Sequence, residues 1–151
     1  MPSDHPNAKW PKRFMGLLGD GKFDEAFERF SDDVVLTIPG KIQGISGTHQ
    51  GKQEYRQFLR AVVEGSAGTF HGRVLSTDGS DTFALMLEAV SAHHGDIGFD
   101  EEACFVYQFG SDGLIHKVDA FLSNVEPLER FYAAIGPMAG PAEVTDRRSW
   151  E

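Results

Sequence analysis

Cysteine is almost absent from this 151-residue sequence: Cys104 is the only one, which excludes an internal disulfide and a zinc site built from several cysteines. No apolar run approaches the ~18 residues that a membrane-spanning helix needs. The first seven residues are polar and lack the apolar stretch of a signal peptide. Together these absences predict a cytoplasmic protein in a reducing compartment.

Positive charge is also scarce, since 14 Lys and Arg residues stand against 23 Asp and Glu residues and the formal net charge is −9. A nucleic-acid surface and docking on anionic lipid both need clustered cations, so neither partner is expected. Hydrophobic residues, by contrast, make up 40% of the chain and include twelve Phe. This composition predicts a soluble globular protein whose length fits one domain with a substantial core.

The first third of the chain has helical periodicity. Trp10, Phe14 and Leu18 share one face of a helix that ends in a glycine-rich turn at 19–21. The following segments are predicted as a short helix over 23–30, a strand over 34–38, a glycine-rich loop over 44–51 and a helix over 52–63.

The second half of the chain changes to strand periodicity. Four strands are predicted over 70–76, 82–92, 99–109 and 114–124, and a last helix over about 127–135. Residues 1–9 and 136–151 show no periodic apolar pattern, so we expect flexible ends around a single domain over 10–135. Helices followed by antiparallel strands indicate an α+β fold in which helices cover one face of a curved sheet.

Two local patterns within this order of elements resemble a known family. The segment Gly19-Asp20-Gly21-Lys22-Phe23-Asp24 leads to a strand that ends at Pro39, and Gly47-Thr48-His49-Gln50-Gly51-Lys52 enters the third helix. Together with the hairpin over 107–115, they resemble the nuclear transport factor 2-like superfamily, in its SnoaL-like and ketosteroid isomerase-like branch. The resemblance implies a cone, in which a curved mixed or antiparallel sheet wraps around the N-terminal helices and leaves an internal pocket.

The resemblance also locates the groups that ketosteroid isomerases use: a carboxylate base, and an oxyanion hole made of a tyrosine and a protonated acid. A gapless alignment places the tyrosine at Phe14, the base at Ile38 and the second acid at Phe105. None of these three side chains can donate or accept a proton, so we expect no ketosteroid isomerase activity by that route. The last-strand aspartate of limonene epoxide hydrolase falls on Ala120, which argues against that chemistry as well.

Strand alternation in the family's register predicts which side chains point into the pocket. If the last hairpin closes between Phe109 and Leu114, Tyr107 lies opposite His116, and Glu101 lies opposite Leu122. The face that carries these residues is expected to be the concave one.

On the preceding strand, the same reasoning points Leu85 and Leu87 inward and Met86, Glu88 and Val90 outward. The predicted pocket is therefore lined by Phe14, Leu18, Ile38, Tyr55, Phe58, Leu85, Leu87, Ala103, Phe105, Tyr107, His116, Val118, Ala120 and Leu122.

The polar members of the concave face are the candidate catalytic residues. Directly opposed residues lie ~5 Å apart between β-carbons, so Tyr107 and His116 could meet, and histidine is the usual general acid or base near neutral pH. The alternative is that this pair is structural and belongs to the core. Glu101 lies ~20 Å along the ladder from His116, so we expect it at the pocket rim or in solvent.

No cofactor and no metal are expected. His93, His94 and Asp96 fall at a predicted hairpin tip, where adjacent strand residues point in opposite directions, so a solvated turn is favoured over a metal site. His49 and His71 fall near the expected rim, and the sequence assigns them no role.

The sequence favours a pocket protein for a small apolar molecule, polycyclic or isoprenoid-like. The alternative is an acid–base enzyme of the isomerase, cyclase, dehydratase or epoxide hydrolase type, acting on a polyketide, steroid or terpenoid-like substrate. A homodimer through the convex face is expected, because Met86, Val90, Val106 and Phe121 would otherwise form an exposed apolar stripe.

Overall fold

The structure is a computed structural model that describes residues 4–136. Its elements are α1 (Pro6–Gly19), α2 (Phe23–Ala26), β1 (Phe30–Ile38), β2 (Gly47–Gln50), α3 (Gly51–Gly65), β3 (His71–Gly79), β4 (Phe83–His94), β5 (Ile97–Phe109), β6 (Ile115–Leu122) and α4 (Glu126–Ile135). Within this part of the chain, no helix is both long and apolar enough to cross a bilayer.

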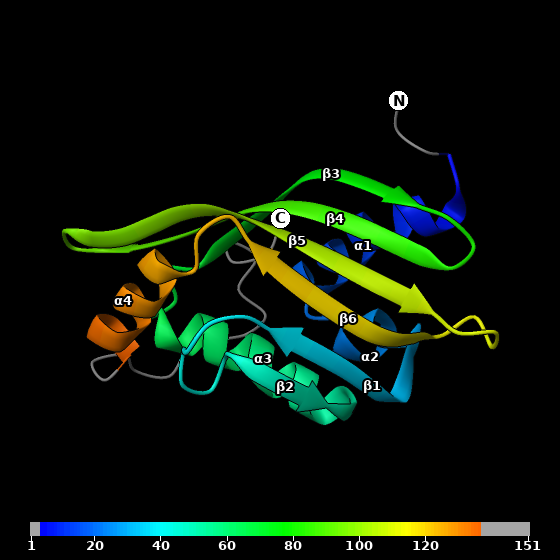
Figure 1. Cartoon of the computed structure of the whole chain (residues 1–151), viewed down its shortest axis with the longest axis horizontal. Coiled ribbons are helices and arrows are strands. Elements are labelled where there is room, and N and C mark those ends of the chain that lie inside the picture. The colour runs from blue at the N-terminus through cyan, green and yellow to red at the C-terminus, as the bar shows by residue number, and fades with distance from the viewer. Residues whose placement is uncertain (1–3, 137–151) are drawn as a thin grey trace.

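The strands form one mixed sheet in the order β2-β1-β6-β5-β4-β3. The β1–β6 pair is parallel, and the other neighbouring pairs are antiparallel. The sheet curves over α1 and α3, which cover the same face (Figure 1). The predicted α+β class, with helices on one side of a curved sheet, is confirmed.

The N-terminal helix begins earlier than the sequence predicts. Residues 6–9 belong to α1, although they fall in the segment expected to be flexible. The His5 ring nitrogen Nδ1 accepts the backbone N–H of Asn7 at 3.1 Å and caps the helix, while Asn7 Nδ2 donates to the Ser80 carbonyl at 2.7 Å. These polar contacts, which an apolar pattern cannot reveal, join the start of α1 to the β3–β4 turn. Residues 137–151 of the expected tail lie outside the described residues.

Two further boundaries differ from the predicted ones. Helix α2 ends at Ala26, so β1 begins at Phe30, within the range predicted as helix. The loop predicted over 44–51 contains the four-residue strand β2, which pairs with the end of β1. The start of β1 and strand β2 are both short segments, rich in phenylalanine and glycine respectively. Their conformation is determined by backbone pairing, of β1 with β6 and of β2 with β1, rather than by local propensity.

The last hairpin contains a bulge that changes its register. Tyr107 pairs with Val118, not with His116, because Gln108 pairs with Lys117 while Phe109 pairs with Ile115. His116 is therefore an extra residue on β6. Beyond the bulge, each β5 residue pairs with a β6 residue two positions later than the predicted partner, so Ala103 lies opposite Leu122. The predicted pairings of Tyr107 with His116 and of Glu101 with Leu122 are wrong.

Strand β4 faces the opposite way from its predicted orientation. Met86 pairs with Phe105, and Glu88 pairs with Ala103, so the even-numbered residues share the concave face. Met86, Glu88 and Val90 are buried, whereas Leu87 is 36% exposed and Leu85 is half-buried. Odd- and even-numbered positions are both apolar in the segment Phe83-Ala84-Leu85-Met86-Leu87. Alternation alone therefore does not determine whether the odd- or the even-numbered side chains point inward.

The narrow end of the cone is packed with aromatic rings. The Trp10 ring centroid lies 5.0 Å from that of Phe14 and 4.9 Å from that of Tyr107. Phe30 and Tyr55 pack edge-on or tilted against the same cluster, with their centroids 5.1 Å apart. Rings at these distances fill the space between α1, α3 and the sheet, so any cavity must lie toward the wider end.

The wide end is closed by α4 and the loop over 39–46. Lys41 N donates to Glu129 Oε2 at 2.8 Å, and the Tyr132 hydroxyl donates to the Val62 carbonyl at 2.8 Å. Gly40 adopts a φ of +93°, and a Cβ there would lie 2.5 Å from Val125 Cγ2, so the loop approaches the start of α4 closely. This end of the cone is therefore built from a loop and a helix that contact each other.

Candidate functional site

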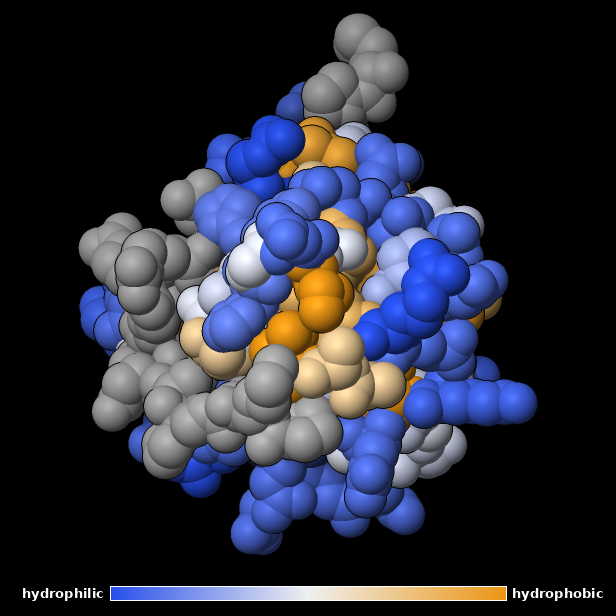
Figure 2. All heavy atoms as spheres, turned by 90° about the vertical axis from the view of Figure 1, so that its left-hand side faces the viewer, coloured by the Kyte–Doolittle hydropathy of each residue, from blue (hydrophilic) through white to orange (hydrophobic). Residues whose placement is uncertain are grey.

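An apolar cavity of about 70 Å³ lies between the helices and the concave face of the sheet. Its wall is formed by Phe14, Met15, Leu18, Ile38, Ile42, Ile45, Tyr55, Phe58, Leu59, Val62, Phe70, Met86, Glu88, Val90, Ala103, Phe105, Tyr107, Ala120, Leu122, Leu128 and Tyr132. Figure 2 views the end of the molecule where α4 lies and shows apolar side chains gathered at the centre of that face, with hydrophilic side chains around them.

Ten of the predicted pocket residues lie on this wall: Phe14, Leu18, Ile38, Tyr55, Phe58, Ala103, Phe105, Tyr107, Ala120 and Leu122. Val118 is buried in the core without lining the cavity. Leu85 and Leu87 lie on the other face of β4, and His116 lies in the β6 bulge, so their assignment to the pocket was wrong.

The wall includes residues that the sequence did not assign to it: Met15, Ile42, Ile45, Leu59, Val62, Phe70, Met86, Glu88, Val90, Leu128 and Tyr132. Most of them are apolar residues whose burial alone is predictable from periodicity. Leu128 and Tyr132, for example, lie on the apolar face predicted for the last helix. The exception is Glu88, because an acidic residue in a strand suggests solvent exposure.

Among the described residues of the cavity wall, Glu88 is the only carboxylate, and it is 3% exposed. Its Oε2 has no hydrogen-bond partner among the described residues. The carboxyl group lies against Gly72 of β3: a Cβ on Gly72 would come within 2.2 Å of Oε2 and 3.0 Å of the carboxyl carbon. The missing side chain at Gly72 therefore leaves the space that the carboxyl group occupies.

Burial raises the pKa of Glu88 from 4.5 to about 8. Burial also raises the pKa values of Tyr55 and Tyr107, and the negative charge of an ionised Glu88 raises both further. These two phenols lie close enough to influence each other's pKa as well. At neutral pH the site consequently holds a neutral carboxylic acid and two neutral phenols in apolar surroundings.

His116 lies outside this site. Its Nε2 is 2.9 Å from both carboxylate oxygens of Asp112, and its Nδ1 is 3.8 Å from Asp33 Oδ1. The side chain is 41% exposed. The bulge turns it toward the 110–113 turn, so it cannot exchange a proton with Tyr107, and the predicted catalytic pair does not form.

Glu101 also lies away from the cavity. Ser123 Oγ donates to its Oε1 at 2.7 Å, and the Glu102 backbone N–H donates to Ser123 Oγ at 2.9 Å. Glu101 lines a separate polar hollow together with His71 and Arg73. Its side chain therefore has a structural partner, and it lies outside the wall on which acid–base chemistry would take place.

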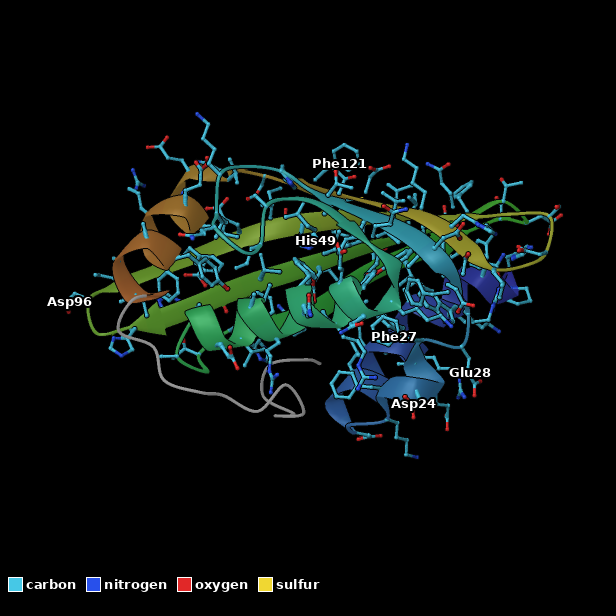
Figure 3. All side chains as sticks on the ribbon, turned by 90° about the horizontal axis from the view of Figure 1, so that it is seen from below. Asp24, Phe27, Glu28, His49, Asp96 and Phe121 are labelled. Carbon is cyan, nitrogen blue, oxygen red and sulfur yellow. The ribbon has the colours of Figure 1, made fainter. Side chains whose placement is uncertain are left out.

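The remaining histidines occupy peripheral positions. The His49 ring centroid lies 5.4 Å from that of Phe58, and its Nε2 lies 2.6 Å from the Ile45 carbonyl oxygen, so it backs the wall without reaching the cavity. His93 Nε2 lies 3.2 Å from Asp100, near the hairpin tip that carries Asp96 (Figure 3). Between residues 4 and 136, no group of three or more His, Cys, Asp or Glu side chains is placed to hold a metal ion.

The fold is similar to that of several solved structures. Bal32a, from a soil-derived mobile gene cassette, is 22% identical with a TM-score of 0.72, and the match covers 83% of this chain and 95% of that one. A putative SnoaL-like polyketide cyclase from Jannaschia sp. CCS1 is 12% identical with a TM-score of 0.62, covering 90% and 98%. TerC, co-crystallised with polyporic acid, is 14% identical with a TM-score of 0.69, covering 85% and 99%.

Three other similar structures are described as NTF2-like proteins, two of them of unknown function. No protein-family model and no curated protein matches the sequence. At these identities the similarity concerns the fold, so the chemistry of the site has to be argued from its own residues.

Proposed function

We propose that this chain, which has the nuclear transport factor 2-like fold, binds a small and mostly apolar molecule inside the cone. The observation that carries the proposal is the cavity itself, whose wall is hydrocarbon except for one acid and the hydroxyl groups of three tyrosines. A concave, apolar and largely preformed site with few polar groups is the usual form of a small-molecule site.

The size of the cavity favours a compact ligand. An engineered cavity of ~150 Å³ lined by Leu, Ile and Phe binds benzene, and the cavity here has about half that volume. A polycyclic or isoprenoid ligand would need wall residues to move. Met15 and Met86 are the flexible candidates, because methionine changes rotamer easily and fills irregular gaps.

The neighbouring structures support a small organic ligand without identifying it. One of them was co-crystallised with polyporic acid, and another is described as a putative polyketide cyclase. Both descriptions concern those proteins. For this chain they support the general idea that the interior of the fold accepts small organic molecules.

A second candidate function is acid–base catalysis in the same cavity, and Glu88 favours it. A buried carboxyl group whose pKa lies near the operating pH is a common feature of enzyme active sites. Phe14, Ile38 and Phe105 all lie on the wall, so the positions that carry the ketosteroid isomerase groups hold hydrocarbon here. Any catalysis would therefore proceed through Glu88, by a route different from that one.

Binding can be tested by filling the cavity. Ala120→Leu adds three carbons on the wall, and Ala89→Leu adds the same three carbons on the opposite sheet face, as a matched control. Apolar probes such as toluene should raise the Tm of the wild type and of Ala89→Leu, because a ligand that binds only the folded state stabilises it.

The Tm of Ala120→Leu should respond weakly or not at all to the same probes. Circular dichroism checks that both variants are folded before the comparison is made. Equal Tm shifts in all three proteins would place the binding outside the cone and contradict the proposal.

A further inference from the structure

We propose that the ligand of the cone carries a hydrogen-bond-accepting oxygen, in its simplest form a carbonyl, and that Glu88 binds this oxygen as a neutral carboxylic acid. This inference rests on the proposed binding function and names the chemical class of its ligand. It makes Glu88 the polar anchor of an otherwise apolar site.

The position of the carboxyl group is the first support. Glu88 is more than nine-tenths buried, lines the cavity, and leaves Oε2 without a hydrogen-bond partner among the described residues. A buried polar atom without a partner is costly, and each such atom calls for an explanation. A ligand that hydrogen-bonds to the carboxyl group in the bound state provides one.

The space that accommodates the carboxyl group is the second support. Gly72 on β3 provides the space, since a Cβ there would come within 2.2 Å of Glu88 Oε2, and the Phe70 ring closes the same side at 3.4 Å from that Cβ position. The acid is therefore held against the backbone of the neighbouring strand, and a group at one fixed place can orient a ligand.

The surrounding charges are the third support. The part of the wall formed by residues 4–136 contains no Lys, Arg or His, and the ionisable side chains on it besides Glu88 are Tyr55 from α3, Tyr107 from β5 and Tyr132 from α4. The wall residues from α1, β1 and β6, and Phe70 just before β3, lack ionisable groups. Nothing facing Glu88 thus favours its ionised form, and burial raises its pKa to about 8. The acid is therefore a hydrogen-bond donor at neutral pH.

A ketone or a similar oxygen suits this donor better than an amine does. An ammonium group would have to lose its water shell and would require Glu88 to ionise in an apolar site, and both steps are costly. A carbonyl oxygen needs neither step. An alkane would leave the acid without a partner.

Three ring compounds of the same size separate these cases: cyclopentanone, methylenecyclopentane and cyclopentylamine. Their dissociation constants are measured by ligand-observed NMR at pH 6 and pH 9.5 on the full chain. For the wild type at pH 6, cyclopentanone should bind about two- to tenfold tighter than methylenecyclopentane, as one net hydrogen bond predicts. At pH 9.5 this preference should disappear, because Glu88 has lost its proton.

Three variants identify the group responsible. Glu88→Leu should lose the preference for the ketone at both pH values. Glu88→Gln keeps an N–H donor without a titrating proton, so it should prefer the ketone equally at pH 6 and pH 9.5. Glu102→Gln removes an exposed carboxylate from β5 and should behave as the wild type.

The two proposals fail in different ways. If cyclopentylamine binds tightest at pH 6, or if ketone and hydrocarbon bind equally, the anchoring role of Glu88 is wrong while the apolar site stands. If none of the three compounds binds at millimolar concentration, the proposed function itself is wrong.

Discussion

Glu88 differs from the other residues of the cavity wall in what it costs the fold. Hydrocarbon on the wall stabilises the protein by leaving water, whereas a buried acid without a partner destabilises it, most of all when ionised. Replacing it by an apolar residue of similar size should therefore raise stability. A group that lowers stability and yet lies in a cavity is what a functional site is expected to contain.

The pH dependence of stability tests the state of this acid. In the unfolded chain Glu88 titrates near 4.5, and in the folded protein it titrates near 8. Between these values the folded state holds a proton that the unfolded state has released. The stability of the wild type should therefore fall as pH rises, by up to about 1.4 kcal/mol per pH unit from this group.

Glu88→Gln does not ionise and should lack this component, so it should exceed the wild type in stability above pH 8. Urea unfolding at pH 5, 7 and 9 measures both proteins. A stability difference between them that stays constant across these pH values would show that the acid is not buried as described.

His116 should matter little for either stability or binding. Its contacts to Asp112 and Asp33 lie at the surface, where water screens such interactions and leaves them weak. His116→Ala should therefore change the free energy of unfolding by less than about 1 kcal/mol and leave the affinity for cavity ligands unchanged. A large loss of ligand affinity with unchanged stability would return this histidine to the site.

At the scale of the elements, the sequence predicts the order and type of most helices and strands, because their apolar periodicity reflects burial. It predicts the inward faces of α1, α3, β5 and most of β6 for the same reason. The β4 orientation and the position of His116 require pairing information. The β4 orientation is obscured because the strand carries apolar residues at both odd and even positions. The position of His116 depends on a bulge that no local sequence signal marks.

The failure to assign Glu88 to the cavity wall follows from these two wrong predictions. With β4 turned the wrong way, Glu88 is assigned to the convex face, and the polar role in the pocket is assigned to His116, which the bulge places outside it. One sequence signal does point to this position: Gly72 lies in a strand, where a glycine suggests a close approach of a neighbouring group, and it pairs with Val90, two residues along β4 from Glu88.

A buried hydrogen bond joins helix α4 to α3. Tyr132→Phe removes the donor to the Val62 carbonyl while keeping the ring, so unfolding should require about 1 kcal/mol less. Chemical denaturation measures this difference. Because Tyr132 also lines the cavity, ligand affinity should change less than stability, and an unchanged stability would mean that the bond contributes nothing.

At the scale of the whole molecule, the outer face of the sheet carries an apolar patch, which we define as Leu85, Leu87, Cys104, Val106 and Phe121. Register aligns Leu87, Cys104 and Phe121 across three strands. Phe121 is 59% exposed and points away from the helices (Figure 3). Met86 and Val90, which the sequence assigned to this face, lie in the cavity wall instead.

We expect this patch to be covered by a second copy of the chain, since monomers seldom expose a contiguous apolar face and two-fold pairing is the commonest solution. Light scattering should then give about 33 kDa, twice the chain mass of 16.6 kDa. Phe121→Glu should shift the protein toward monomer, because it places an unpaired charge in the interface. Glu102→Gln, on the same face outside the patch, serves as the control. A wild-type monomer at micromolar concentration would contradict this expectation.

The irregular pairing of β3 has a consequence for aggregation. β3 is the edge strand at one side of the sheet, and its ladder to β4 shifts register between Val74 and Ser76. The other edge, β2, has only four residues. Long, flat edge strands recruit further chains into open-ended stacks, and a bulged or very short edge does not. The edges of this sheet therefore disfavour open-ended stacking, whereas the pairing we expect through the apolar patch would close after two subunits.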